Sequence, residues 1–500
     1  MEKSIKKNIV FIIGWIITIV QTVMSGWMIL LLKNNNMIPN NLLIIAGIVL
    51  FCFVLLCRFL MKKEIRLIRF VIGAVIAVLM CGLLAFANGK IGKLTDTLEN
   101  ITDAKEETTK IGVYVLVDDS AQNVQDASEY QFGILSQINR DDTDNAVEQI
   151  EEELSDDILV MEYDGTTELA DALNSGDCRA IVISENFVSM ISESEGYENF
   201  ESSIREIASY EWKTVVKETS SDSRANESTD KEQASSDNKH ASEDMVFSMY
   251  ISGIDTYGDI STKSRSDVNI IAVVNVNTHQ VLLVSTPRDY FVPLSISNGV
   301  KDKLTHAGIY GIEVSKDTLG MLYDFDIDYY FRVNFNGFED MINSLDGVTV
   351  QSDYDFSVGT FHYVKGTNNL NAEEALAFAR ERYSFADGDR QRGRNQMEVI
   401  KGVIKKIQTP AVLNNFNELM ESLEGSFQTD MPYDVLSSLV KDQLTSGDSW
   451  TVKSYSVDGT GSMSTTYSMN QELYVMIPDQ STVDQAKEMI QKIIDGETFE

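Results

Sequence analysis

Three long stretches without a charged residue lie near the amino terminus, and they constrain the fold of this 500-residue chain more than any other feature. They run from Ile9 to Leu32, from Met37 to Cys57 and from Phe70 to Ala87. A helix of about 20 apolar residues crosses a bilayer with all its backbone hydrogen bonds satisfied. We therefore expect residues 1–89 to be a membrane anchor of three transmembrane helices, at about 9–32, 37–57 and 70–87.

The flanks of these stretches predict their orientation. Three lysines precede the first stretch and five basic residues lie between the second and third, whereas the loop between the first two contains only Lys33. Because short cytoplasmic loops are enriched in Lys and Arg, the amino terminus is predicted to be cytoplasmic and the chain after about Gly89 extracytoplasmic. A cleaved signal peptide is the alternative for the first stretch, but its apolar core is too long and no small-residue cleavage site follows it.

Residues 105–216 alternate between apolar runs typical of strands and helical stretches, which predicts a small α/β accessory domain. The strand-like runs are Ile111 to Val117, Asp157 to Tyr163 and Cys178 to Ser184. Cys178 is the only cysteine outside the apolar stretches, so no disulfide can form within the extracytoplasmic part of one chain. We interpret Cys178 as a small buried residue rather than a reactive thiol. No catalytic or metal-binding pattern is recognisable in this domain.

Residues 217–245 are predicted to be a flexible linker. From Lys217 to Asp244 the sequence is rich in serine and charge and has no aliphatic side chain larger than alanine. Such a segment cannot bury enough apolar surface to offset the entropy lost on ordering. The linker separates the accessory domain from residues 246–500, where Ser481 to Ile494 is predicted to be an amphipathic closing helix.

Three apolar runs after the linker predict neighbouring strands: Phe247 to Ile254, Val268 to Val276 and Gln280 to Ser285. The second is nearly all β-branched, which is typical of a strand buried on both faces.

Polar residues border these three predicted strands and would meet at one edge of a sheet. Asp255 follows the first strand, Arg265 and Asp267 precede the second, and Arg288 and Asp289 follow the third. Carboxylates beside arginines can hold Mg²⁺, which commonly takes one or two protein carboxylates together with phosphate oxygens and water. The alternative for each aspartate taken alone is a turn or helix-capping role.

Five arginines lie within fifteen residues of a chain whose formal net charge is -35: Arg380, Arg382, Arg390, Arg392 and Arg394. The planar guanidinium group binds two oxygens of a phosphate or carboxylate at once, so several converging arginines suit a polyanion such as a pyrophosphate. A solvated basic face is the alternative for such a run.

The surrounding residues predict how these arginines are presented. Asn371 and Glu374 form a capping pattern at the start of a helix. Arg380 and Arg382 are two apart, which in extended backbone places both on one face. A second helix is predicted from Asn395 onwards, and its start, where free N–H groups and the helix dipole favour an anion, would carry Arg392, Arg394 and Gln396.

Six ordered motifs resemble the LytR-CpsA-Psr family over about residues 246–410. They are GID at 253–255, RSD at 265–267, TPRD at 286–289, DKLTHA at 302–307, NFNGFEDMINSLDGV at 334–348, and LNAEEALAFARERY followed by DGDRQRGRNQ at 387–396. The three apolar stretches and the accessory domain resemble the capsule-biosynthesis, CpsA-like branch of that family.

The resemblance implies a three-layer α/β/α phosphotransferase domain at residues 246–500. Its members transfer a glycopolymer from a polyprenyl-pyrophosphate carrier to peptidoglycan, so the implied partners are both substrates, the bacterial cell membrane and capsule assembly proteins. It also implies a pocket for the prenyl chain and Mg²⁺ held by Asp255 and Asp267. Pyrophosphate-binding residues are implied at Arg265, Arg288, Lys303, Arg380, Arg382, Arg392 and Gln396.

Catalysis is assigned on the same basis to Arg265, Arg288, Asp389 and Arg392. Asp389 is our hypothesis for the general base, because it is the acidic residue embedded among the arginines. Arg390 and Arg394 match no fixed family position and are interpreted as supporting charge.

Other functions stay open at this stage. A non-catalytic receptor for lipid-linked glycan, or a regulator of capsule assembly, would use the same residues, and so would a hydrolase acting on the lipid pyrophosphate. Direct regulation of transcription is disfavoured because the predicted cytoplasmic pieces are too short for a DNA-binding domain. The acidic composition also disfavours nucleic acid as a partner. The motifs do not tell capsular polysaccharide from teichoic acid.

Overall fold

The computed structural model describes residues 2–34, 38–62, 67–102, 106–216, 245–254, 256–409, 412 and 416–499. These residues form two compact units. The first comprises residues 1–103, 407–424 and 431–449, and the second comprises residues 104–406, 425–430 and 450–500. The predicted linker from Lys217 to Asp244 and the predicted metal ligand Asp255 lie outside the described residues.

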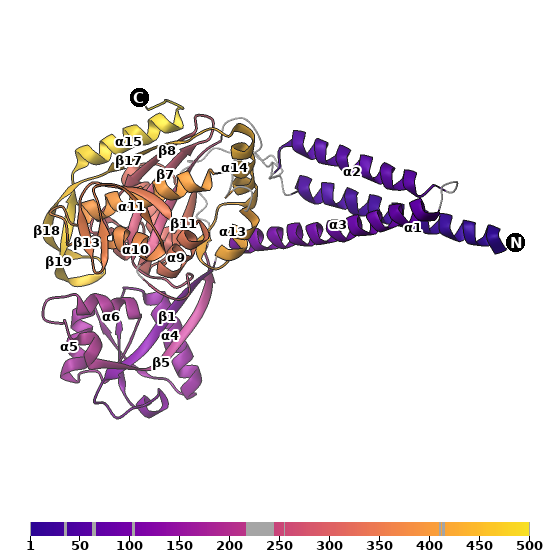
Figure 1. Cartoon of the computed structure of the whole chain (residues 1–500). Coiled ribbons are helices and arrows are strands. Elements are labelled where there is room, and N and C mark those ends of the chain that lie inside the picture. The colour runs from indigo at the N-terminus through magenta and orange to yellow at the C-terminus, as the bar shows by residue number, and fades with distance from the viewer. Residues whose placement is uncertain are drawn as a thin grey trace, which may run out of the picture. The chain divides into compact units, whose positions relative to one another are not determined.

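The first unit contains the three predicted apolar helices, α1 (Glu2–Asn34), α2 (Asn40–Leu60) and α3 (Leu67–Thr102) (Figure 1). Each includes a segment long and apolar enough to cross a membrane: Phe11–Asn34, Asn40–Leu60 and Ile68–Gly92. These three helices indicate that the chain is anchored in a membrane.

Two shorter helices from far along the chain, α13 (Phe416–Leu423) and α14 (Tyr433–Ser446), contact α3 in the same unit. The Lys90 ammonium lies 3.6 Å from the Glu421 carboxylate. Part of the region predicted as one domain from residue 246 onwards therefore groups with the membrane helices.

The accessory domain, residues 106–216 of the second unit, is a five-stranded sheet of order β3-β2-β4-β1-β5. Its strands are β1 (Glu106–Leu116), β2 (Gln131–Leu135), β3 (Leu159–Tyr163), β4 (Ala180–Ile183) and β5 (Ile204–Val215). Its helices are η1 (Gln125–Ala127), α4 (Arg140–Leu154), α5 (Thr166–Ser175), α6 (Glu185–Ser192) and α7 (Phe200–Ser203). The predicted alternation holds, but the sequence pattern did not reveal β2 or the charge-rich strand β5. Cys178 is buried, and burial raises its pKa to about 11, as expected for a structural thiol.

The rest of the second unit, here called the main domain, is built on a six-stranded sheet of order β16-β11-β6-β7-β8-β17. The strands are β6 (Val246–Ile254), β7 (Ser266–Asn275), β8 (Gln280–Ser285), β11 (Tyr329–Val333), β16 (Phe427–Thr429) and β17 (Thr451–Ser456). All three strands predicted after the linker are present. β7 lies between β6 and β8 and is antiparallel to both, with Ile270 opposite Ser285.

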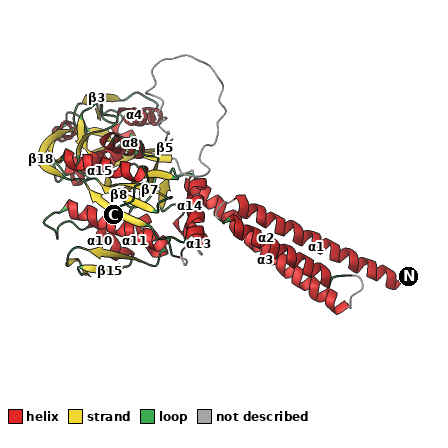
Figure 2. Ribbon diagram, turned by 90° about the horizontal axis from the view of Figure 1, so that it is seen from above, coloured by secondary structure: helices red, strands yellow, loops and turns green. Residues whose placement is uncertain are grey.

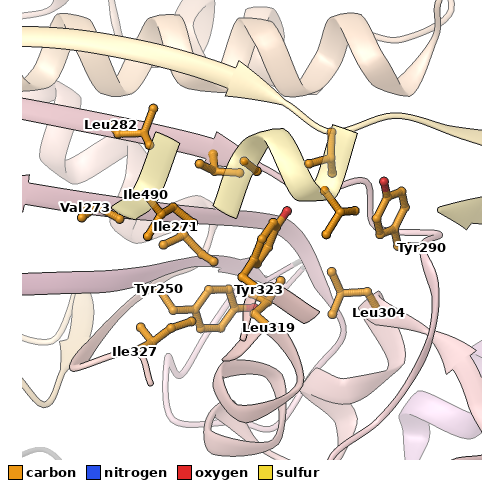
Figure 3. Packing of buried hydrophobic residues seen from close by; sticks show 14 of the residues in the cluster. Tyr250, Ile271, Val273, Leu282, Tyr290, Leu304, Leu319, Tyr323, Ile327 and Ile490 are labelled. Carbon is orange, nitrogen blue, oxygen red and sulfur yellow. The ribbon is translucent and has the colours of Figure 1, made fainter. Parts of the chain in front are cut away.

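Alternate residues of β7 bury opposite faces of this sheet. Ile271 and Val273 pack against α8 (Ile312–Tyr323) and α15 (Gln480–Ile494), in the cluster shown in Figure 3. Ile270 and Ala272 pack on the other face against Met397 of α11 (Asp389–Ile407). Figure 2 shows α15 and α11 on opposite sides of β7 and β8. This arrangement is the predicted three-layer α/β/α fold, and α15 is the predicted closing helix.

Shorter elements surround this sheet. The helices are η2 (Leu304–Ile309), α9 (Phe335–Ser344) and α10 (Ala372–Arg380). Two-stranded ribbons pair β9 (Phe291–Pro293) with β10 (Lys301–Lys303), β12 (Val348–Ser352) with β15 (Gly366–Leu370), and β13 (Phe356–Val358) with β14 (Phe361–Tyr363). A hairpin of β18 (Gly459–Thr466) and β19 (Met469–Pro478) reaches the accessory domain, where Met469 is part of the core.

A buried ion pair joins the accessory domain to the main domain. Arg332 of β11 donates from Nη1 to Glu107 Oε1 of β1 at 2.6 Å, and the two residues are 1% and 6% exposed. The same carboxylate oxygen accepts from the backbone N–H of Ile312 at 2.9 Å, and Arg332 also donates to the carbonyl of Thr262. Both charges have partners on each other and on the backbone, which offsets part of the desolvation cost of burying them.

Replacing Arg332 with leucine should leave Glu107 buried without its cation and lower the free energy of unfolding by about 3–5 kcal/mol. The measurement is urea unfolding of the detergent-solubilised chain, followed by tryptophan fluorescence. A double variant, Arg332→Leu with Glu107→Met, should recover much of the loss. Equal stability of the single variant and the parent would contradict a tightly paired interface.

Candidate functional site

The predicted edge residues of the main sheet meet as expected. Because β7 and β8 are antiparallel, the start of β7 and the end of β8 share one edge, and Arg288 Nη1 donates to Asp267 Oδ2 at 2.6 Å. Thr305 Oγ1 donates to Asp267 Oδ1 at 3.2 Å. The Lys303 ammonium lies 2.9 Å from Asp289 Oδ1. Asp289 was expected at this edge, although no role was assigned to it, whereas Thr305 of the DKLTHA motif was not expected there.

The part of the arginine-rich segment from Asp389 to Gln396 forms the first turns of α11. Asp389 Oδ1 lies 3.1 Å from Arg392 Nη2 and 3.7 Å from Arg382 Nη1. The helix was predicted to begin at Asn395, and this is wrong, since it begins at Asp389. Gly388 turns the chain with a φ of 50°, and an aspartate in the first turn is favourable at the positive end of the helix dipole.

Gly393 brings this helix close to the end of β8. A Cβ atom added at Gly393 would lie 2.8 Å from Ser285 Oγ, so a larger residue would require the Ser285 hydroxyl to move. The small residue between Arg392 and Arg394 therefore lets α11 pack closely on the end of β8.

Arg380 and Arg382 differ from the prediction. The capping pattern of Asn371 and Glu374 is present as a reciprocal capping box, but the helix it starts runs through Arg380. Arg380 is therefore helical rather than extended, and its guanidinium stacks 4.1 Å from the centre of the Phe335 ring. Arg382 lies in the loop that follows and donates to the Tyr383 hydroxyl at 2.7 Å. The two arginines thus have different surroundings, because the helix continues further than the spacing suggested.

The remaining basic residues of the segment bind different partners. Arg390 Nη2 lies 2.6 Å from Asp458 Oδ1, whereas Arg394 Nη2 donates to Asp387 Oδ2 at 3.0 Å. Gln396 Nε2 donates to the carbonyl of Ala379 at 3.3 Å. Arg265, just before β7, is bonded by the accessory domain, because its Nη1 donates to Glu193 Oε1 at 2.5 Å.

A cavity of about 520 Å³, here called the arginine cavity, collects most of these side chains. Its charged lining is Arg288, Asp289, Lys303, Arg382, Asp387, Asp389 and Arg390, and the β18–β19 hairpin contributes Gly461, Tyr474 and Met476. A smaller cavity of about 20 Å³ shares Arg288, Asp389 and Arg390 and adds Asp267, Arg392 and Gln396. Arg265, Arg380 and Arg394 line neither cavity. No pattern in the sequence indicated that the hairpin residues would line a cavity.

Opposite charges are nearly balanced here. Five cationic side chains and four carboxylates line the two cavities. Burial alone would raise the pKa of Asp267, but Arg288, Arg392 and Arg265 outweigh it, so that the pKa is lowered and the group is ionised. Burial lowers the pKa of Arg392, against the pull of Asp389 and Asp267, while the pKa of Arg288 is raised by Asp267 and Asp289 despite its burial.

Two buried guanidinium N–H groups at the arginine cavity, Arg288 Nε and Arg390 Nε, have no hydrogen-bond partner among the described residues. The buried oxygens Asp389 Oδ1 and Asp289 Oδ1 each lie close to a cation, Arg392 and Lys303 respectively. Buried polar atoms are normally paired, so an unpaired group usually awaits a ligand, an ion or water. The two guanidinium N–H groups can bind an anion, and the Asp389 carboxylate beside Arg392 can accept a proton.

Asp267 fits the ligand chemistry of Mg²⁺. It is ionised, offers hard oxygens, and keeps 20% of its side-chain surface exposed. Its predicted partner Asp255 lies outside the described residues.

Comparison with known proteins places the chain in a family. Residues 212–492 match the model of the LytR_cpsA_psr family. The chain belongs to the LytR-CpsA-Psr family. Among curated relatives, the polyisoprenyl-teichoic acid–peptidoglycan teichoic acid transferase TagU of Enterococcus faecalis is 31% identical over 219 residues, covering 43% of this chain and 71% of that protein. TagU of Bacillus subtilis is 32% identical over 217 residues, covering 43% and 69%.

Solved structures of similar proteins cover about half of the chain. Bacillus subtilis TagV is 25% identical with a TM-score of 0.44, covering 52% of this chain and 100% of that one. TagT bound to LI-WTA is 26% identical with a TM-score of 0.41, covering 50% and 91%.

The lowered pKa of Asp267 predicts a pH-dependent stability. Its carboxylate contributes fully above the unfolded-state pKa of about 3.9, and this contribution is lost as the pH falls through the lower pKa of the folded state. Urea unfolding should therefore show that Asp267→Asn is less stable than the parent at pH 6, with the difference shrinking below about pH 4. A difference that stays constant down to pH 2 would contradict the ion pair with Arg288.

Proposed function

We propose that this protein is a cell-wall glycopolymer ligase. In this proposal it transfers a polysaccharide of the capsular or teichoic-acid type from a polyprenyl-pyrophosphate carrier to peptidoglycan by phosphoryl transfer. The observation that carries the proposal is the meeting of Arg288 and buried Arg392 with the carboxylates of Asp267 and Asp389, around a cavity where two guanidinium N–H groups have no partner among the described residues. The teichoic acid transferase names of its relatives support the same class of reaction.

The residues have separate tasks in the transfer. Arg288, Arg392, Arg382 and Lys303 would bind the pyrophosphate oxygens and neutralise charge as it shifts toward the leaving group. A hydroxyl oxygen of peptidoglycan attacks the phosphorus that carries the glycan, and the bond from this phosphorus to the bridging oxygen breaks. Polyprenyl phosphate leaves with the electron pair of that bond. Asp389, whose carboxylate lines the cavity, would accept the hydroxyl proton.

Asp267, joined by Asp255 on the family resemblance, would hold Mg²⁺ at the inner end of the site. When bound, this ion would supply further positive charge for the phosphate oxygens. It would also shift the nearly balanced site toward net positive charge.

The membrane helices fit this substrate. A carrier with a long prenyl tail stays in the bilayer, so an enzyme that acts on it must work at the membrane surface. We propose that the main domain works on the extracytoplasmic face, as the basic residues around α1 and α2 predict.

Arg392→Ala should reduce transfer at least about a hundredfold, because a desolvated cation that neutralises phosphate oxygens is lost. The assay joins a polyprenyl-pyrophosphate oligosaccharide to peptidoglycan oligomers with the full chain and Mg²⁺, and the product is identified by mass spectrometry. Arg394→Ala is the matched control: it lies on the same helix, binds Asp387 and lines neither cavity, so its rate should stay near that of the parent. Tight lipid binding by the parent without product under any condition would instead favour a glycan receptor.

Asp389→Asn should slow transfer by about a hundredfold while lipid binding persists, because the amide cannot accept the proton. Binding is followed with a fluorescent polyprenyl pyrophosphate and transfer with the same product assay. The control is Asp353→Asn. Asp353 accepts a hydrogen bond from Gln391, which lies on the same helix as Asp389. Transfer at the normal rate in Asp389→Asn would refute the general-base role.

A further inference from the structure

A second polar cavity lies between the accessory domain and the main domain, and its volume is about 170 Å³. The accessory domain supplies Asn139, Asp142, Asn186 and Ser189, and the main domain supplies Lys263 and Arg265. Ile309 is the only apolar residue among the described residues that line it. Since one water occupies about 30 Å³ of liquid, this interdomain cavity can admit a ring-sized polar molecule.

The two walls of the interdomain cavity are fixed to each other. Thr108 of β1 donates its backbone N–H to the carbonyl of Ser261 at 2.9 Å and accepts from the N–H of Lys263 at 3.1 Å. Asn186 Nδ2 of α6 donates to the carbonyl of Lys263 at 2.9 Å. Together with the buried pair of Glu107 and Arg332, these bonds make the cavity preformed.

The charges around this cavity are already paired. Lys263 Nζ lies 3.4 Å from Asp142 Oδ2, Lys110 Nζ lies 3.9 Å from Glu185 Oε2, and Arg265 is bonded by Glu193. A polyanion would have to displace these carboxylates. The other polar side chains of the lining are hydroxyls and amides of Ser, Thr and Asn, which both donate and accept hydrogen bonds. Hydroxyl groups of a sugar ring do the same, so a saccharide matches this lining better than a phosphate.

Arg265 connects the interdomain cavity to the transfer site. It lines the cavity and lies two residues before Asp267, which lines the smaller cavity beside Arg288 and Arg392. We propose that the accessory domain and the main domain jointly bind a saccharide unit of a transfer substrate in the interdomain cavity. The accessory domain then positions glycan next to the reacting phosphate. This inference rests on the proposed ligase function and adds a substrate contact to it.

The test removes polar groups from the cavity without straining the backbone. Asn139 has a φ of 53°, which glycine adopts freely, and its side chain makes no capping bond to α4. The double variant Asn139→Gly with Ser189→Ala therefore removes an amide and a hydroxyl. Asn145→Ala, at an exposed position of α4 outside the cavity, is the control.

Binding is measured directly, by saturation-transfer NMR of the full chain in detergent with the N-acetylglucosamine–N-acetylmuramic acid disaccharide as one probe. The second probe is a short-chain prenyl-pyrophosphate N-acetylglucosamine. The double variant should bind one of them at least tenfold more weakly than the parent and the control, and KM for the corresponding substrate should rise with kcat nearly unchanged. A change with the disaccharide identifies the acceptor as the source of the saccharide, and a change with the prenyl probe identifies the donor.

Equal binding and equal KM in the parent and the double variant would overturn the inference and leave the ligase intact. If the parent showed no transfer, the proposed ligase function would be refuted. The effect of the double variant on disaccharide binding could still be measured. The two failures are therefore distinguishable.

Discussion

The site depends on the burial of β7 on both faces. Ile271 and Val273 are held against α8 and α15, and Ile270 and Ala272 against α11, so β7 can neither slip by one residue nor rotate. Its antiparallel pairing with β8 then places the start of β7 beside the end of β8 and the residues that follow it. Asp267 and Arg288 meet for that reason, and the charge chemistry of the cavity follows from a packing constraint.

Three of the cationic side chains at the arginine cavity and the smaller cavity are paired with carboxylates. Arg288 binds Asp267, Lys303 binds Asp289, and Arg392 lies beside Asp389. Such pairing keeps several cations ordered in a small volume, where they would otherwise repel one another. In the proposed reaction, pyrophosphate oxygens would replace these carboxylates as the partners of cations that are already in place. Preorganised positive charge of this kind is how phosphoryl-transfer sites lower the barrier.

The parts of the molecule that could be predicted from the sequence are those determined by neighbouring residues or by a periodic hydrophobic pattern. The apolar helices, the three strands after the linker, the capping box at Asn371 and the clustering at the strand edge all follow from hydrophobic pattern and turn chemistry. The predicted start of α11 was wrong because the residues from Asp389 to Arg394 include no apolar side chains at helical spacing. Such side chains begin only at Met397. Arg380 was misjudged because nothing local marks the last turn of α10.

Other features depend on contacts distant in sequence. Tyr474 and Met476 reach the arginine cavity through a hairpin some 80 residues beyond the arginines, and Glu193 reaches Arg265 from another domain. β5 was missed because its strand pairing with β1 outweighs its charged composition. Side-chain patterns carry no information about which distant segment will lie opposite, so such residues emerge only from the fold.

The buried pair of Glu107 and Arg332 makes each of the two domains depend on the other. Arg332 lies on an inner strand of the main sheet, yet its counter-charge comes from another domain, so without that partner the cation would lose its ion pair. Position 332 of the main domain and the accessory domain are therefore coupled through a single ion pair, so a change in one alters the electrostatic environment of the other.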